Sequence, residues 1–184
     1  MMPTVSVFWG EGGRGTANYY GLEDEVDIYM GTFSKSLGSL GGYMAGKDRI
    51  VDFVKHNSRP FMFAASVPPA QAAAALASLR FLEAHPELVS RLNTLADRFR
   101  SQLKDKGLNI IEAKTPIVPI FTYDAYRTLD KCRKIYDGGV YVNSVLPPAA
   151  PEGECMIRTS LMASLTDALV DEAAEIIAEA INND

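Results

Sequence analysis

One lysine of this chain lies in a setting that a surface lysine rarely has. Lys35 has small and hydroxylated neighbours and no acidic ones, in the segment GTFSKSLGSLGG that covers residues 31–42. Glycines let the backbone approach a ligand closely and adopt a positive φ without strain. Hydroxyls can donate hydrogen bonds to phosphate oxygens. An amine beside such donors suits a lysine that forms a Schiff base, because a desolvated lysine becomes a nucleophile more readily.

Taken alone, this segment leaves two interpretations open. It is either a cofactor loop or a glycine-rich surface loop with a solvated lysine. It is not the phosphate-binding loop of nucleotide hydrolases, because Lys35 precedes most of the glycines. A strand over residues 26–33 would place Lys35 just past its carboxyl end, where open α/β sheets bind ligands.

Length and composition narrow the classes of protein. The chain has 184 residues, which is enough for one large domain or two small ones. With 47% hydrophobic and 22% charged residues it can build a core. The formal charge of -5 argues against a nucleic-acid footprint, which would need a basic patch, so we expect no nucleic-acid partner. We also expect no transmembrane segment, because no apolar run is long enough to span a bilayer.

The cysteines and histidines indicate the compartment and exclude one kind of metal site. Cys132 and Cys155 are isolated, which favours reduced thiols over a disulfide and a cytoplasmic protein. The start of the chain lacks the basic and apolar regions of a signal peptide. The two cysteines do not have metal-ligand spacing and the chain has only two histidines, so we predict no structural zinc site and no metal.

The two halves of the chain have different patterns. In the first half we predict a strand over residues 26–33, another within 41–46, and helices over 47–57 and 70–84. A helix with an apolar stripe from Leu88 to Leu103 follows and stops before Gly107. The second half predicts β-α-β-β-α: strands at 117–121, 140–142 and 156–159, and helices begun by Asp124 and Thr166. Such a unit would be a small sheet with helices on one face.

Several blocks of this sequence resemble one enzyme family. Residues 30–46, MGTFSKSLGSLGGYMAG, are similar to the cofactor-lysine segment of the α-oxoamine synthases, which are fold-type I enzymes dependent on pyridoxal 5'-phosphate. The turn GEGGRG at 10–15 and the strand that begins VDI at 26 fit the same family. Three blocks resemble its serine palmitoyltransferase branch: KHNSRPFMFAAS at 55–66, GVYVN at 139–143 and MIRTSLMA at 156–163.

The resemblance implies an α/β fold with two parts. Residues 1–95 would be the end of the large α/β domain that contains the cofactor lysine, and residues 96–184 a small C-terminal α+β domain. Family members are about twice as long, and their first half supplies the groups that orient the cofactor ring. The chain is therefore expected to be the C-terminal half of such an enzyme.

The resemblance also assigns roles to residues near the lysine. Lys35 matches the residue that binds pyridoxal 5'-phosphate covalently and then moves a proton at the amino-acid α-carbon. Thr32 matches a hydroxyl that binds the cofactor phosphate, and Ser34 is close enough to share this role. For both hydroxyls, hydrogen bonding to the local backbone is the alternative.

Two further candidates lie outside the lysine segment. Ser66 matches a small or hydroxylated residue that reaches the cofactor phosphate of the neighbouring subunit, and the alternative is a cap for the helix after Pro68 and Pro69. Arg158 is a single charged residue in an apolar strand, and a guanidinium matches a carboxylate bidentately. The matching family position binds the substrate carboxylate, with a structural ion pair as the alternative.

The expected activity is that of an acyltransferase. It would condense an amino acid, with serine as first candidate, with an acyl-CoA and release CO2, a step of sphingolipid biosynthesis. The 8-amino-7-oxononanoate synthase and glycine C-acetyltransferase activities are alternatives within the family. The alternative to an enzyme is a non-catalytic module that acts only in folding or dimerisation. We expect a homodimer, because the aromatic and small-residue run 61–69 lies by the partner's active site in relatives.

Overall fold

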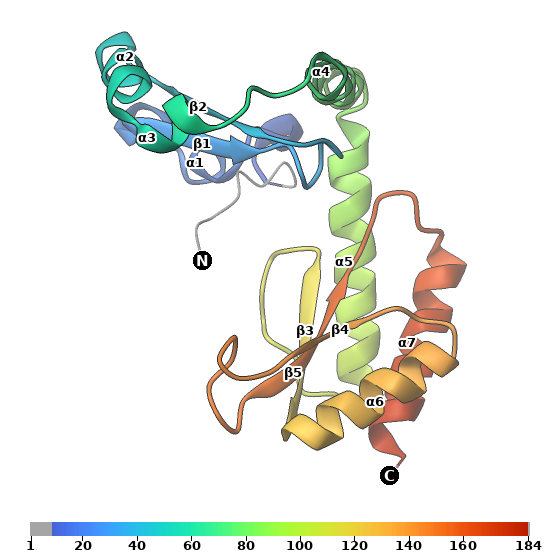
Figure 1. The fold of residues 1–184 in the computed structure, drawn as a ribbon. Coiled ribbons are helices and arrows are strands. Elements are labelled where there is room, and N and C mark those ends of the chain that lie inside the picture. Colours follow the sequence, from blue (N-terminus) through green and yellow to red (C-terminus); the bar gives the residue numbers. More distant parts are fainter. Residues whose placement is uncertain (1–8, 184) are drawn as a thin grey trace. The chain divides into compact units, whose positions relative to one another are not determined.

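The computed structural model describes residues 9–183, which form two compact units (Figure 1). The first unit ends at Val89 and the second begins at Ser90. This division and the boundary predicted after residue 95 both fall within one helix, α5 (Glu87–Asp105). We propose α5 as the connection between the two domains.

The first unit contains an antiparallel pair of strands. β1 (Ile28–Thr32) pairs with β2 (Gly42–Gly46), with Thr32 opposite Gly42. The strands approach so closely that a Cβ added to Gly42 would lie 2.5 Å from the carbonyl oxygen of Gly31. Only glycine therefore fits at this end of β2. Both strands lie where the sequence predicts them.

Helices precede and follow this strand pair in the first unit. They are η1 (Glu11–Gly13), α1 (Thr16–Tyr20), η2 (Glu23–Glu25), α2 (Asp48–Asn57), α3 (Arg59–Phe63) and α4 (Pro69–Ala84). In α4 alanines give a high helix propensity, but Ala75 is its one buried residue. Leu76, Leu79 and Phe81 of α4 are 47%, 41% and 58% exposed. Although α4 is apolar, none of the helices among residues 9–183 is long and apolar enough to cross a bilayer.

The second unit has the predicted β-α-β-β-α order after α5. Its elements are β3 (Ile117–Tyr123), α6 (Ala125–Asp137), β4 (Asn143–Val145), β5 (Cys155–Ser160) and α7 (Asp167–Asn182). The strands form an antiparallel sheet in the order β3-β5-β4. β3 is an edge strand of this sheet, which fits Pro119, because proline has no N–H to donate to a ladder.

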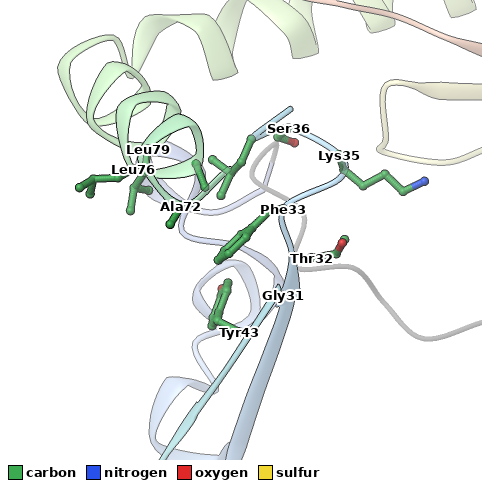
Figure 2. Close-up of a pocket in the computed structure, with 11 residues that line it drawn as sticks. Gly31, Thr32, Phe33, Lys35, Ser36, Tyr43, Ala72, Leu76 and Leu79 are labelled. Atoms are coloured by element: carbon green, nitrogen blue, oxygen red, sulfur yellow. The ribbon is translucent and has the colours of Figure 1, made fainter. Parts of the chain in front are cut away.

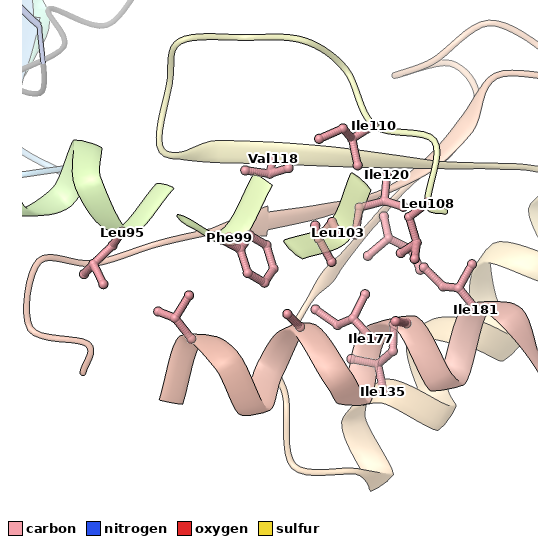
Figure 3. Packing of buried hydrophobic residues seen from close by; sticks show 14 residues of the cluster. Leu95, Phe99, Leu103, Leu108, Ile110, Val118, Ile120, Ile135, Ile177 and Ile181 are labelled. Atoms are coloured by element: carbon pink, nitrogen blue, oxygen red, sulfur yellow. The ribbon is translucent and has the colours of Figure 1, made fainter. Parts of the chain in front are cut away.

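One face of this sheet packs against α5, α6 and α7. Val118, Ile120 and Ile157 alternate along β3 and β5 with half-buried residues and are completely buried. Figure 3 shows the apolar side chains of the helices that meet them. These include Leu95, Phe99, Leu103, Ile135 and Ile177. The alternation leaves the other face of the sheet, which carries Arg158, turned away from this core.

Side chains cap α6 and α7 as predicted. Asp124 accepts a hydrogen bond from the Arg127 N–H at 2.9 Å and begins α6. Thr166 accepts one from the Leu169 N–H at 3.2 Å and begins α7. Each cap satisfies an amide that has no partner inside its own helix.

The prediction of a strand at residues 140–142 is wrong. Gly139 donates its N–H to the Tyr136 carbonyl and Val140 donates to the Ile135 carbonyl, so these amides complete the end of α6. The strand instead starts three residues later, at Asn143. Val140 and Val142 still pack against the core, which explains the apolar pattern without a strand.

Candidate active site

Lys35 lies in a short loop that directly follows β1. Phe33 donates its N–H to the Gly41 carbonyl at 2.9 Å, and Ser39 donates to the Phe33 carbonyl at 2.8 Å. Gly38 donates to the Lys35 carbonyl at 3.0 Å. Gly38 and Gly41 have φ values of 57° and 105°, which favour glycine. The loop of residues 33–41 is therefore closed by its own backbone just beyond the end of the strand.

The hydroxyls of Thr32 and Ser34 lie together at the base of this loop. Their oxygens are 2.8 Å apart, and Thr32 Oγ1 also accepts the Ser34 N–H at 3.2 Å. Thr32 Oγ1 lies 3.3 Å from the Gly41 carbonyl oxygen. The local hydrogen bonding that was the alternative role is thus present. Because each hydroxyl turns about a single bond, the same pair can redirect its hydrogens to a bound anion.

The Lys35 amine is free among the described residues. It is exposed and forms no hydrogen bond or ion pair with residues 9–183. Figure 2 shows its side chain and the Thr32 hydroxyl on the side of β1 away from α4. A free primary amine and adjacent hydroxyl donors fit a ligand with an aldehyde and a phosphate, as pyridoxal 5'-phosphate has. The described residues do not themselves desolvate the amine.

An apolar cavity of about 420 Å³ borders the loop, and its lining includes Thr32 and Lys35 as well as Ala72, Leu76 and Leu79 of α4 (Figure 2). Phe33 and Tyr43 stack in its wall with ring centroids 6.1 Å apart. A Cβ added to Gly31 would lie 2.3 Å from Tyr43 Cε1, so this ring needs a glycine beneath it. Tyr43 was not a candidate from the sequence, because nothing in its immediate neighbours marks it.

Gln71 is a second residue that the sequence analysis missed. It accepts a hydrogen bond from Ser39 in the lysine loop. One signal was present in the sequence: Gln71 is a single polar residue at the start of the alanine-rich run of α4. Its contact depends on a residue far away in the sequence, which no local pattern indicates.

Ser66 lies in the same unit, in the segment between α3 and α4, and is exposed. The capping role considered for it is wrong. Pro68 occupies the position before α4, and no side chain caps this helix. The Gln71 N–H, which a capping side chain could accept, donates instead to the Pro68 carbonyl at 3.0 Å, and Pro69 has no N–H to satisfy.

Arg158 lies in the second unit, on β5. Its backbone pairs with Pro119 of β3 and Asn143 of β4. The side chain is half-buried between buried neighbours Ile157 and Thr159, on the opposite face of the sheet. Its guanidinium forms no ion pair or hydrogen bond with the part of the chain that the structure describes, so the structural ion pair considered for it is not found there.

The sequence profile described as aminotransferase class I and II matches residues 5–177. The chain belongs to this aminotransferase family. Within it, the chain is 43% identical over 166 residues to a serine palmitoyltransferase of Sphingobacterium spiritivorum, which covers 90% of this chain and 42% of that protein. It is 40% identical over 154 residues to an 8-amino-7-oxononanoate synthase of Petrotoga mobilis, with 84% and 39% covered.

The fold of this chain is also similar to that of a solved structure. A structure of SPT with a PLP internal aldimine superposes with a TM-score of 0.91 at 33% identity and covers 96% of this chain. The predicted α/β fold class and the resemblance to α-oxoamine synthases are confirmed. The chain spans less than half the length of the relatives that it matches.

Proposed function

We propose that the protein is a pyridoxal 5'-phosphate-dependent acyltransferase that condenses an amino acid with an acyl-CoA and releases CO2. The observation that carries this proposal is the free Lys35 amine beside the Thr32 and Ser34 hydroxyls at the end of β1. The names of its relatives in the aminotransferase family support the same chemistry.

In this proposal the lysine loop holds the cofactor. Lys35 binds it through the amine, and the Thr32 hydroxyl, with Ser34 beside it, donates hydrogen bonds to its phosphate. When bound, pyridoxal 5'-phosphate supplies an electron sink for the amino-acid substrate. Lys35 then has a second task, because its amine can take and return a proton at the substrate α-carbon.

Arg158 and Ser66 have separate proposed roles. Arg158 binds the substrate carboxylate, which is supported by a half-buried guanidinium without a partner among the described residues. Ser66 reaches the cofactor phosphate of the neighbouring subunit, which is supported by its exposure between α3 and α4. A homodimer follows from this role. It is also supported by the adjacent Phe61, Met62 and Phe63, which are 63%, 51% and 80% exposed.

We propose serine and a long-chain acyl-CoA as substrates, in sphingolipid biosynthesis in the cytoplasm. The 43% identity with a serine palmitoyltransferase supports this choice. The 40% identity with an 8-amino-7-oxononanoate synthase favours a second candidate, which would use alanine and a pimeloyl thioester. Substrate choice is tested by comparing serine and alanine for the spectral change that each produces in the complete protein loaded with pyridoxal 5'-phosphate.

The cofactor role of Lys35 is tested by covalent trapping. The complete protein is mixed with pyridoxal 5'-phosphate, reduced with borohydride and digested, and the modified peptides are identified by mass spectrometry. We expect modification chiefly at Lys35 and a visible absorption band that Lys35→Ala abolishes. Lys55 on α2, which is also exposed, serves as an internal control for random labelling. Equal modification of both lysines would contradict the proposal.

A further inference from the structure

The lysine loop is attached to the start of α4 at two points. The Ser39 hydroxyl lies 2.7 Å from the carbonyl oxygen of Gln71 and 2.9 Å from its side-chain Oε1. Two residues later, a Cβ added to Gly41 would lie 2.7 Å from Val67 Cγ2, so the loop backbone packs directly on Val67. One contact therefore reaches the first turn of α4 and the other the segment directly before it.

Gln71 provides a firm point of attachment. It lies in the first turn of α4, where its own N–H donates to the Pro68 carbonyl at 3.0 Å. Both Gln71 and Ser39 are half-buried, so water competes less for their hydrogen bond than at an open surface. The helix itself does not need an amide here, since the residues on either side are alanines.

Without this attachment the loop would depend on weak local structure. Its other described ties outside Val67 are backbone bonds within residues 33–41, the Thr32 and Ser34 hydroxyl contacts and the stacking of Phe33 on Tyr43, all of them at the end of a two-stranded ladder. An isolated pair of strands is marginally stable in water. Ser39 also donates its N–H to the Phe33 carbonyl, so fixing Ser39 fixes the closure of the loop around Lys35.

We propose that Gln71 is a positioning residue that acts through the Ser39 hydroxyl to hold Lys35 in place for cofactor attachment. The role of Gln71 in cofactor binding rests on the proposed function of Lys35. The contact between Gln71 and Ser39 does not rest on that function, so the contact and the cofactor role can be tested separately. One hydroxyl hydrogen serves two acceptors, the backbone and side-chain oxygens of Gln71. Ser39→Ala therefore removes both contacts, whereas Gln71→Leu removes only the contact to Oε1.

The first test measures how fast trypsin cleaves the lysine loop when no cofactor is present. Limited trypsin digestion of the complete protein is followed at the bonds after Lys35 and after Lys55. We expect Ser39→Ala to speed cleavage after Lys35 about three- to tenfold, the range that the loss of one neutral hydrogen bond predicts. Gln71→Leu should have a smaller effect, and Ser39→Thr should stay near the wild type. Cleavage after Lys55 reports general unfolding of α2, so an equal rise at both bonds overturns the proposal.

The second test measures the trapping rate at Lys35 with pyridoxal 5'-phosphate and borohydride. We expect Ser39→Ala and Gln71→Leu to lower the ratio of Lys35 to Lys55 modification. The double variant should be no worse than Ser39→Ala, because the Gln71 side chain acts only through the missing hydroxyl. Additive effects, or wild-type ratios in both single variants, overturn the positioning role. Absence of Lys35 trapping in the wild type overturns the proposed function, while the trypsin result still decides whether the contact holds the loop.

Discussion

Arg98 of α5 holds the Asp171 carboxylate of α7 through two parallel hydrogen bonds, from Nε and Nη2, each 2.6 Å long. Gln102 Nε2 donates a third bond to the same carboxylate at 2.5 Å. The hydrogen bonds from Arg98 and then Gln102 lower the pKa of Asp171 from 3.8 to about 2. This carboxylate therefore joins two helices of the second unit in its ionised form.

The lowered pKa predicts a pH-dependent contribution to stability. A carboxyl whose folded pKa is depressed stabilises the fold above its unfolded pKa, and the contribution disappears as the pH falls through the folded value. We expect Asp171→Asn to lower the midpoint of denaturant unfolding at pH 7. The difference from the wild type should shrink between about pH 4 and about pH 2.

Asp130→Asn is the matched control for this measurement. Asp130 forms an exposed pair with Lys134 one turn away on the same helix, 3.0 Å apart, and joins no two elements. Such pairs contribute little. An equal effect of both substitutions at pH 7 would show that the link between α5 and α7 has no special importance.

Arg158→Lys should weaken amino-acid binding while leaving the cofactor in place. Lysine keeps the charge but loses one of the two parallel hydrogen bonds to a carboxylate. A hydrogen bond to a charged group contributes about 1.5–3 kcal/mol, so serine affinity should fall by roughly one to two orders of magnitude. Spectroscopic titration with serine measures this change. Arg133→Lys, at an exposed pair within α6, is the control. Loss of cofactor from Arg158→Lys would instead indicate a phosphate-binding or structural role.

Ile157→Ala should destabilise the second unit strongly. Ile157 is completely buried on β5 between the sheet and the helices. Truncation leaves a cavity, and substitutions of this kind cost about 2–5 kcal/mol. Leu129→Ala removes a similar side chain that is 49% exposed on α6, and should cost much less. Chemical unfolding measures both, and comparable losses would mean that the core packs differently.

Phe63→Ser should weaken the proposed homodimer. Phe63 is 80% exposed beside Phe61 and Met62, and obligate interfaces are rich in such apolar side chains. We expect the complete protein to shift from dimer to monomer at micromolar concentration in light scattering. Tyr126→Ser, at a residue that is 87% exposed on α6, provides a control of similar chemistry. An unchanged mass for Phe63→Ser would falsify the placement of the interface.

The elements that the sequence predicts well are those whose signals are local. Asp124 and Thr166 lie directly before their helices, and their side chains cap the amides that need a partner. The apolar stretches at 117–121 and 156–159 also predict β3 and β5, although the alternation of buried and half-buried residues along them is seen only in the structure. Lys35 is marked by its immediate neighbours in the same way.

What the sequence hides depends on contacts between distant residues. The apolar residues 140–142 suggest a strand, but the N–H of Val140 is already used at the end of α6. Leu169 of α7 is large and apolar but 50% exposed, whereas the small Ala174 and Ala178 are buried. Small alanines that let helices approach closely are hard to recognise in a pattern weighted by large side chains.

The sparse burial of α4 has a consequence for its backbone motions. Helices of this length gain most of their stability from packing, and α4 contributes only Ala75 to the interior of the first unit. In the 184-residue chain its amide hydrogens should exchange with deuterated solvent far sooner than those of α7, which buries five residues. Leu76, Leu79 and Phe81 of α4 are exposed, so a partner surface that covers them should slow this exchange. Deuterium uptake along α4 would then detect binding at that face.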